Sequence, residues 1–317
     1  MKTINSIFLL SLVLFTFSCD DILEEDITDS VIQTIAPQNN EEIESNVVSF
    51  RWNTVKGADK YRLQIYSSTQ AIALDSLVSG SGFTCPLLPG AYQWRVRGEN
   101  FGYQSAYCLQ MSFSVIETDD LTNQQVTLAN PASGFYTNAA SIVCSWQGIN
   151  VADSYDFELV DLTNGQTIIH QQSNITTTNL TLNNTMLNHD AEYQWRVRAV
   201  NSTSQTPYAT RRFLIDRVNP NPPLNSLPAT NSTQLINQSI NFSWNPLPDT
   251  GVIQSPVSAV IEFSNDSNFT SILLSSPSVT ASFQQTFTVP GTYFWRIKMT
   301  DLAGNSVYNT PFKFTIN

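Results

Sequence analysis

Charged and catalytically useful residues are scarce in this sequence of 317 residues. Charged side chains make up 13% of the chain, which has two histidines and four cysteines. His170 and His189 lie apart, without a cysteine or carboxylate cluster at the spacing of metal ligands, so we expect no metal site. The sequence also lacks a phosphate-binding glycine loop and a Gly-x-Ser-x-Gly nucleophile motif. We therefore expect a protein that is not an enzyme and that binds no cofactor.

Positively charged residues are fewer than negatively charged ones in this sequence. There are 15 Lys and Arg residues against 26 Asp and Glu residues, which gives a formal net charge of −11. This balance argues against general affinity for nucleic acid or for anionic lipid. After the first segment, no stretch has apolar residues at helical spacing, and Ser, Thr, Asn and Gln are abundant. These features predict an all-β protein.

The N-terminus has the features of a targeting segment. Lys2 precedes an apolar run over residues 7–17, which is too short for a stable membrane span. The run ends in Thr16-Phe17-Ser18-Cys19, which resembles the signal of bacterial lipoproteins. That resemblance implies a signal peptide over residues 1–18 and a lipid on Cys19, through which the protein would bind the membrane. The alternative is an ordinary secretory signal followed by an incidental cysteine.

An acidic run, Asp20-Asp21-Ile22-Leu23-Glu24-Glu25-Asp26, follows at once. It resembles the surface-export signal of lipoproteins in the Bacteroidetes group, and a solvated tether over residues 19–29 would have the same composition. We expect an outer-membrane lipoprotein exposed at the cell surface. A periplasm-facing position is the alternative.

Three cysteines remain after Cys19, and an odd number does not suggest a disulfide framework. Cys144 has the same strand parity as Ile142 and Trp146, so we expect a buried apolar residue. Cys85 and Cys108 fall in one repeat and could pair, but the fold predicted below places them near opposite ends of a domain.

One motif recurs through the chain. Tyr92-Gln93-Trp94-Arg95-Val96-Arg97 returns at residues 193–198 and, as Tyr-Phe-Trp-Arg-Ile-Lys, at residues 293–298. The interval of about 100 residues is the size of a domain and well above the 20–50 residues of solenoid units. The sequence therefore predicts three copies of one small domain.

Other alternating segments recur at matched spacing. They are a strand ending in tryptophan (residues 48–52, 142–146 and 240–244), a strand led by tyrosine (61–65 and 155–159, with Ala259 leading 259–263) and a closing strand (113–115, 213–215 and 314–316). Together with the motif they resemble fibronectin type III domains, which implies three tandem β-sandwiches. We expect these immunoglobulin-like domains at residues 30–116, 123–216 and 220–317. Ala259 and the turn Asp301-Leu302-Ala303-Gly304-Asn305, which is similar to one in bacterial immunoglobulin-like domains, set the third copy apart.

Aromatic residues offer one candidate contact site. The six tryptophans occupy two repeated strand positions in each copy, so we expect them in the cores rather than on a sugar-binding surface. Phe101, Tyr103 and Tyr107 lie between the last two strands of the first copy, where binding loops of such folds gather. They are candidate ligand contacts, and simple packing of the hairpin is the alternative.

The outward arginines offer a second candidate. In the second copy, Asp156 and Glu158 should lie beside the arginines of the motif strand. In the first copy, Arg62 and Gln64 should face Arg95 and Arg97, which predicts an uncompensated basic face. We expect either a site for an acidic glycan or partner segment, or neutralisation by Glu99 or by the acidic tether.

The sequence thus predicts a monomeric, non-catalytic surface lipoprotein whose domains act as a binding or spacer module for protein or glycan partners. The alternatives are a glycan-binding accessory protein of a polysaccharide-uptake system and a structural or adhesive stalk. The resemblance does not select among them, because one fold hosts many functions.

Overall fold

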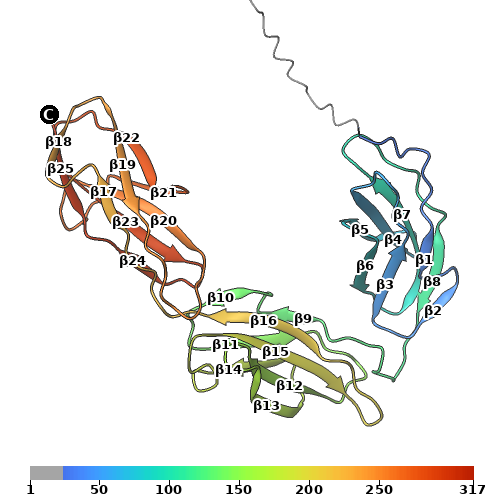
Figure 1. The fold of residues 1–317 in the computed structure, drawn as a ribbon. Helices are drawn as coiled ribbons and strands as arrows, with labels where there is room; N and C mark the ends of the chain where they lie inside the picture. Colours follow the sequence, from blue (N-terminus) through green and yellow to red (C-terminus); the bar gives the residue numbers. More distant parts are fainter. Residues whose placement is uncertain (1–23) are drawn as a thin grey trace, which may run out of the picture. The chain divides into compact units, whose positions relative to one another are not determined.

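The computed structural model describes residues 24–317, and every regular element in that range is a β-strand (Figure 1). The strands form six sheets, which pack in pairs as three sandwich domains. Domain 1 is one compact unit, and domains 2 and 3 together make the other. In the described part of the chain, no helix is long and apolar enough to cross a membrane. The predicted signal peptide and Cys19 lie outside the described residues.

Domain 1 packs a three-stranded sheet, β1-β3-β6, against a five-stranded sheet, β2-β8-β7-β4-β5. Neighbouring strands pair antiparallel except for β2 and β8, which are parallel. The strands are β1 Thr34–Ala36, β2 Glu41–Ile43, β3 Val47–Trp52, β4 Lys60–Ser67, β5 Ile72–Val78, β6 Gly82–Pro86, β7 Gly90–Glu99 and β8 Met111–Val115.

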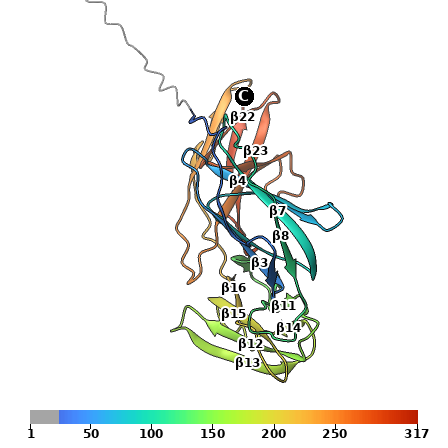
Figure 2. The ribbon, with the colours of Figure 1, turned by 90° about the vertical axis from the view of Figure 1, so that its right-hand side faces the viewer.

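Domain 2 repeats this strand order, with a small sheet β9-β11-β14 and a large sheet β10-β16-β15-β12-β13. Both views show β12 between β13 and β15 (Figure 1, Figure 2). The one parallel pair is again the short early strand and the last strand, β10 and β16. The strands are β9 Leu128–Asn130, β10 Phe135–Thr137, β11 Ile142–Trp146, β12 Ser154–Asp161, β13 Thr167–Ile175, β14 Asn179–Leu182, β15 Ala191–Val200 and β16 Ala209–Ile215.

Domain 3 has the same order once more, with sheets β17-β19-β22 and β18-β25-β23-β20-β21 and a short β24 that pairs with β23. Its parallel pair is β18 with β25. The strands are β17 Leu224–Leu227, β18 Ser232–Gln234, β19 Ser239–Asn245, β20 Val257–Ser264, β21 Leu274–Ser278, β22 Ser282–Thr286, β23 Gly291–Asp301, β24 Ser306–Tyr308 and β25 Phe312–Ile316.

The cores follow from the two-residue alternation of the strands. On β15, Tyr193, Trp195 and Val197 are fully buried, while the glutamine and arginines between them are only partly so. All six tryptophans lie in the cores with at most 3% of their surface exposed, which confirms the prediction from strand parity. Burial of such aromatic side chains is the main stabilising contribution in a sandwich of this size.

Each motif tyrosine is also a polar anchor. The hydroxyl of Tyr92 donates to the carbonyl of Leu88 at 2.9 Å, and the hydroxyl of Tyr193 donates to that of His189 at the same distance. The hydroxyl of Tyr293 makes the equivalent bond at 3.0 Å. This bond from the start of a strand to the carbonyl four residues earlier is the tyrosine corner of immunoglobulin-like sandwiches.

The cysteines of the described residues are single buried thiols. Cys85 and Cys108 belong to the core of domain 1 without a bond between them, and Cys144 is fully buried in domain 2, as its strand parity predicts. Burial raises the pKa of Cys85 to about 11, because the thiolate would lose its hydration there. The same cause raises the pKa of Cys144 further.

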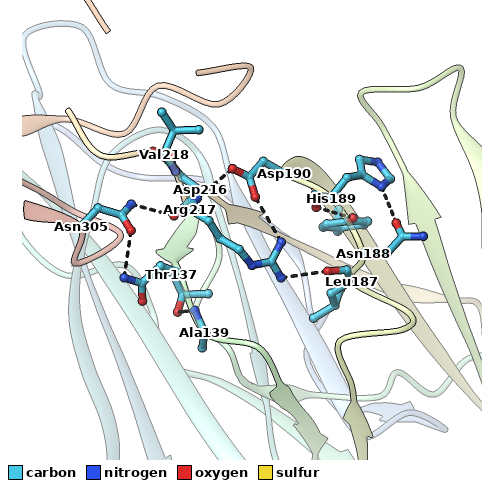
Figure 3. Close-up of polar contacts among 12 residues, drawn as sticks. Thr137, Ala139, Leu187, Asn188, His189, Asp190, Asp216, Arg217, Val218 and Asn305 are labelled. Carbon is cyan, nitrogen blue, oxygen red and sulfur yellow. Dashed lines mark hydrogen bonds and ion pairs between the residues drawn. The ribbon is translucent and has the colours of Figure 1, made fainter. Parts of the chain in front are cut away.

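Buried hydrogen bonds join domains 2 and 3. Asp216 directly follows β16 and is fully buried, and its side chain accepts bonds from the backbone N–H and the hydroxyl of Ser255 in the β19–β20 loop. The side-chain amide of Asn305 donates to the backbone carbonyl of Asp216 at 2.8 Å and accepts from Asn138 at 3.0 Å (Figure 3). The turn Asp301–Asn305, distinctive in the sequence, is therefore part of the joint.

Candidate functional site

A stack of arginine and tyrosine side chains covers the outer face of the large sheet of domain 1. Arg95 and Arg97 point outward from β7, and Tyr107 lies between them, with its ring centre 4.1 Å and 4.9 Å from the two guanidinium carbons. Arg95 also lies over Tyr66 of β4 at 5.3 Å. Such contacts contribute about 0.5–2 kcal/mol each, depending on their exposure to water.

The same stack occurs in the other two domains. Tyr208 lies between Arg196 and Arg198 in domain 2, at 4.8 Å and 4.9 Å from the guanidinium carbons. Tyr308 lies over Arg296 in domain 3 at 3.8 Å. Tyr107 lies between β7 and β8, as the sequence predicts, and its contact with the arginines of the motif strand recurs in the other two domains.

The prediction that the basic face of domain 1 is uncompensated is wrong for two of its three arginines. Glu99 at the end of β7 binds both Arg62 and Arg97, at 2.9 Å and 2.8 Å. Asp75 on β5 binds Arg62 from the other side at 2.9 Å. Neutralisation by Glu99, the alternative considered from the sequence, is therefore confirmed, whereas Asp75 was missed because it lies on a strand that the motif does not include.

Arg95 differs from its counterparts in domains 2 and 3. Arg196 binds Glu158 and Arg296 binds Glu262, at the register positions that face them across the sheet. The residue facing Arg95 is Gln64, whose side-chain oxygen accepts from Nε at 3.0 Å and from Nη2 at 2.8 Å. Nη2 also donates to the Tyr66 hydroxyl, while Nη1 makes no hydrogen bond within residues 24–317.

The two carboxylates of this face stay ionised down to low pH. A hydrogen bond from Gln64 and the ion pair with Arg62 hold the pKa of Asp75 below its ordinary value. Burial acts to raise the pKa of Glu99, but the bonds from Arg97 and Arg62 outweigh it and leave that pKa lowered. Three arginines thus face two carboxylates, and the unmatched positive charge lies at Arg95.

The other two candidates lie apart from the stack, at the tip of the β7–β8 loop. Phe101 is 95% exposed and Tyr103 is 39% exposed. The side-chain oxygen of Asn100 accepts the backbone N–H groups of Gly102 and Tyr103, which fixes the tip as an Asx turn. In domain 2 the equivalent Asn201 makes the same turn, with polar residues in place of the aromatics. Among the described residues, no hydrogen bond or ring contact links Phe101 or Tyr103 to the stack.

The chemistry of the stack suits binding rather than catalysis. A guanidinium with an open donor edge between two aromatic rings is suited to bind a carboxylate or another oxyanion. In the described part of the chain, no group of three or more His, Cys, Asp or Glu side chains is arranged to hold a metal ion. The described residues include no domain other than the three sandwiches.

Neither the protein-family models nor the curated proteins include a match to this chain. Solved structures do match. The FN1–FN3 domains of chicken CNTN1 are 14% identical, over 90% of this chain and 96% of that one, with a TM-score of 0.41. The fibronectin(III)-like modules of Clostridium thermocellum CbhA are 16% identical, over 61% and 93% of the two chains, with a TM-score of 0.38.

The fold assignment rests on the strand order and the tyrosine corner, which are repeated three times. The chain is a tandem of three fibronectin type III-like β-sandwiches. This confirms the all-β fold class that the motif predicted, and the family resemblance at the level of the domain type.

Proposed function

We propose that this protein is a non-catalytic surface lipoprotein whose sandwich domains hold and present a binding surface for an acidic glycan. The observation that carries the proposal is the open guanidinium edge of Arg95, which Gln64 leaves without a carboxylate partner. A uronic acid unit would offer a carboxylate to Nη1 and an apolar ring face to the neighbouring tyrosines. Because Tyr66 and Gln64 already hold the Arg95 side chain, binding would cost little side-chain entropy.

The test replaces Gln64 with the residue type found in domains 2 and 3. Gln64→Glu would place a carboxylate against Arg95, as Glu158 does against Arg196 in domain 2. We expect binding of polygalacturonate, measured by isothermal titration calorimetry, to weaken at least ~10-fold, which corresponds to about 1.4 kcal/mol. Because the Gln64 side-chain amide also donates to Asp75 at 2.8 Å, the substitution places two carboxylates side by side, so we expect thermal stability to fall while the domain stays folded. Binding by the variant equal to that of the natural protein would contradict the assignment of this site.

A matched control uses domain 2. Glu158→Gln should release Arg196 and leave polygalacturonate binding at the domain 1 site as it was. Because this variant removes a negative charge, tighter binding at the domain 1 site would mean that general charge, and not the local geometry at Arg95, sets the affinity.

A spacer role is the second candidate, and the joint between domains 2 and 3 favours it. Asp216, Ser255, Asn305 and Asn138 exchange hydrogen bonds across that joint, which restricts movement of one domain against the other. A stalk that binds no glycan would give no heat of binding with polygalacturonate in any variant. That outcome would favour the spacer role over the binding role.

A further inference from the structure

At one pair of facing positions in the large sheet, domain 3 has a small residue where the other domains have a large one, and a large residue where they have a small one. In domain 2, Tyr155 of β12 faces the small Ala199 of β15, and its ring packs against Trp146 with centres 5.4 Å apart. Domain 1 has the same arrangement of a tyrosine, a small residue and a tryptophan. In domain 3, Ala259 faces Met299. The aromatic ring that covers the tryptophan in the first two domains is therefore missing from the third.

The missing tyrosine also leaves a hydrogen-bond donor unused. The hydroxyl of Tyr61 accepts the backbone N–H of Val55 at 2.8 Å, and that of Tyr155 accepts the N–H of Ile149 at 2.8 Å. Val55 and Ile149 lie three residues after the tryptophan of their domains, and Leu247 is the residue at that position in domain 3. Its N–H takes part in no hydrogen bond within the described residues.

A cleft of about 490 Å³ lies beside Ala259, and Trp244, Leu247, Ala259 and Met299 line it. Trp244 is only 2% exposed, because it packs with Met299 and its neighbours in the core, so the cleft lies outside the tryptophan ring. Its volume is within the range of small-molecule and side-chain pockets, about 300–1,000 Å³, and exceeds what one tyrosine ring needs. Asp249 also lines it and has a buried Oδ2 that accepts no hydrogen bond within residues 24–317. The cleft thus combines an apolar wall with an unused donor and an unused acceptor.

The rim of the cleft is apolar as well. Leu247 and Val257 expose more than a third of their surface, and Val279 at the β21–β22 turn is fully exposed. A free small phenol in the cleft would leave these side chains in water, whereas a polypeptide that inserts one ring would cover them.

We propose that this cleft binds the hydroxyphenyl ring of a tyrosine side chain on a partner polypeptide, beside the place that the domain's own tyrosine occupies in domains 1 and 2. The ring would lie over Ala259 between Leu247 and Val279, and its hydroxyl would meet the N–H of Leu247. The site is in a different domain from the Arg95 stack, so it stands whether or not that stack binds a glycan.

The first experiment fills the cleft from within. Ala259→Tyr combined with Met299→Ala restores the pair found in domain 2. We expect 4-methylphenol to shift the NMR signals of the Trp244 indole and the Met299 methyl in the natural chain, with a dissociation constant on the order of 1 mM. The signals of Trp244 should not respond in the double variant. Toluene, which lacks the hydroxyl, should bind more weakly than 4-methylphenol.

The second experiment separates a polypeptide from a free phenol. A capped pentapeptide with a central tyrosine between valines should bind at least ~10-fold more tightly than 4-methylphenol, and Val279→Ser should reduce that advantage without changing 4-methylphenol binding. A peptide that binds no better than 4-methylphenol would overturn the choice of a polypeptide partner. Absence of a response in the natural chain, or an equal response in the double variant, would overturn the pocket itself. Val279→Ser changes an exposed residue, so its result does not depend on refolding of the core.

Discussion

Replacement of Asp216 by alanine should separate the unfolding of domains 2 and 3. The side chain is fully buried. Its Oδ2 accepts hydrogen bonds from the backbone N–H of Ser255 at 3.1 Å and from the Ser255 hydroxyl at 2.6 Å. Ser255 is itself 3% exposed, so water cannot readily replace the lost acceptor. A buried donor without a partner costs about 1–3 kcal/mol, and two such donors would cost about 2–5 kcal/mol.

The lost hydrogen bonds destabilise the contact between domains 2 and 3 more than the hydrophobic core of either domain. Asp216 is fixed to domain 2 because its N–H donates to the carbonyl of Thr137, whereas Ser255 belongs to domain 3. Differential scanning calorimetry of the natural chain should show domains 2 and 3 unfolding in one cooperative transition. In Asp216→Ala, this transition should split or broaden, and its onset should move to lower temperature.

The matched control is Asp153→Ala, which removes an exposed carboxylate of domain 2. It should leave the calorimetric profile unchanged, because a surface substitution outside a packed or bonded region changes stability by less than about 0.5 kcal/mol. If Asp216→Ala gave the same profile as this control, the hydrogen bonds at Asp216 would not couple the two domains, and the reasoning would fail.

The remaining predictions concern pH, thiols and lipidation. The pKa values of Asp75 and Glu99 are lower in the folded state than their ordinary values of 3.8 and 4.5. The two carboxylates therefore contribute fully to stability above those ordinary values, and the contribution is lost as the pH falls through the lower pKa values of the folded state. In urea unfolding, the free energy of unfolding of domain 1 should therefore fall below about pH 4, and this fall should be smaller in Asp75→Asn than in the natural chain. Because burial raises the pKa of Cys144, iodoacetamide at pH 8 should modify it only after unfolding, as mass spectrometry would detect. Cys19→Ala should abolish labelling with a radioactive fatty acid and release the protein from membranes, and retention of both would rule out the lipoprotein assignment.

The repeated motif was sufficient to predict the framework of the fold. Alternation of Tyr, Trp and Val with polar residues identified a central strand in each domain, since each of these side chains must face a core. The pairing of Arg196 with Glu158 also followed from parity, because those two strands are neighbours in the sheet.

Contacts that depend on a third strand or on a second domain could not be predicted in the same way. Asp75 reaches Arg62 only because β5 pairs with β4 in one particular register, which no local pattern encodes. Asp216 was not singled out, because its partners Ser255 and Asn305 are distant in sequence. The replacement of a tyrosine by Ala259 was visible, but the cleft depends also on Met299 and on the longer loop after Trp244.

The parallel pairing of a short early strand with the last strand has a mechanical consequence. In domain 2, β10 and β16 are adjacent and run in the same direction, with Phe135 facing Phe213 and Thr137 facing Ile215. A pull on the two ends of the domain would draw these strands past each other along their length, so their hydrogen bonds would have to break together rather than one after another. The same geometry recurs between β2 and β8 and between β18 and β25. Each sandwich is therefore built to resist stretching between its two ends.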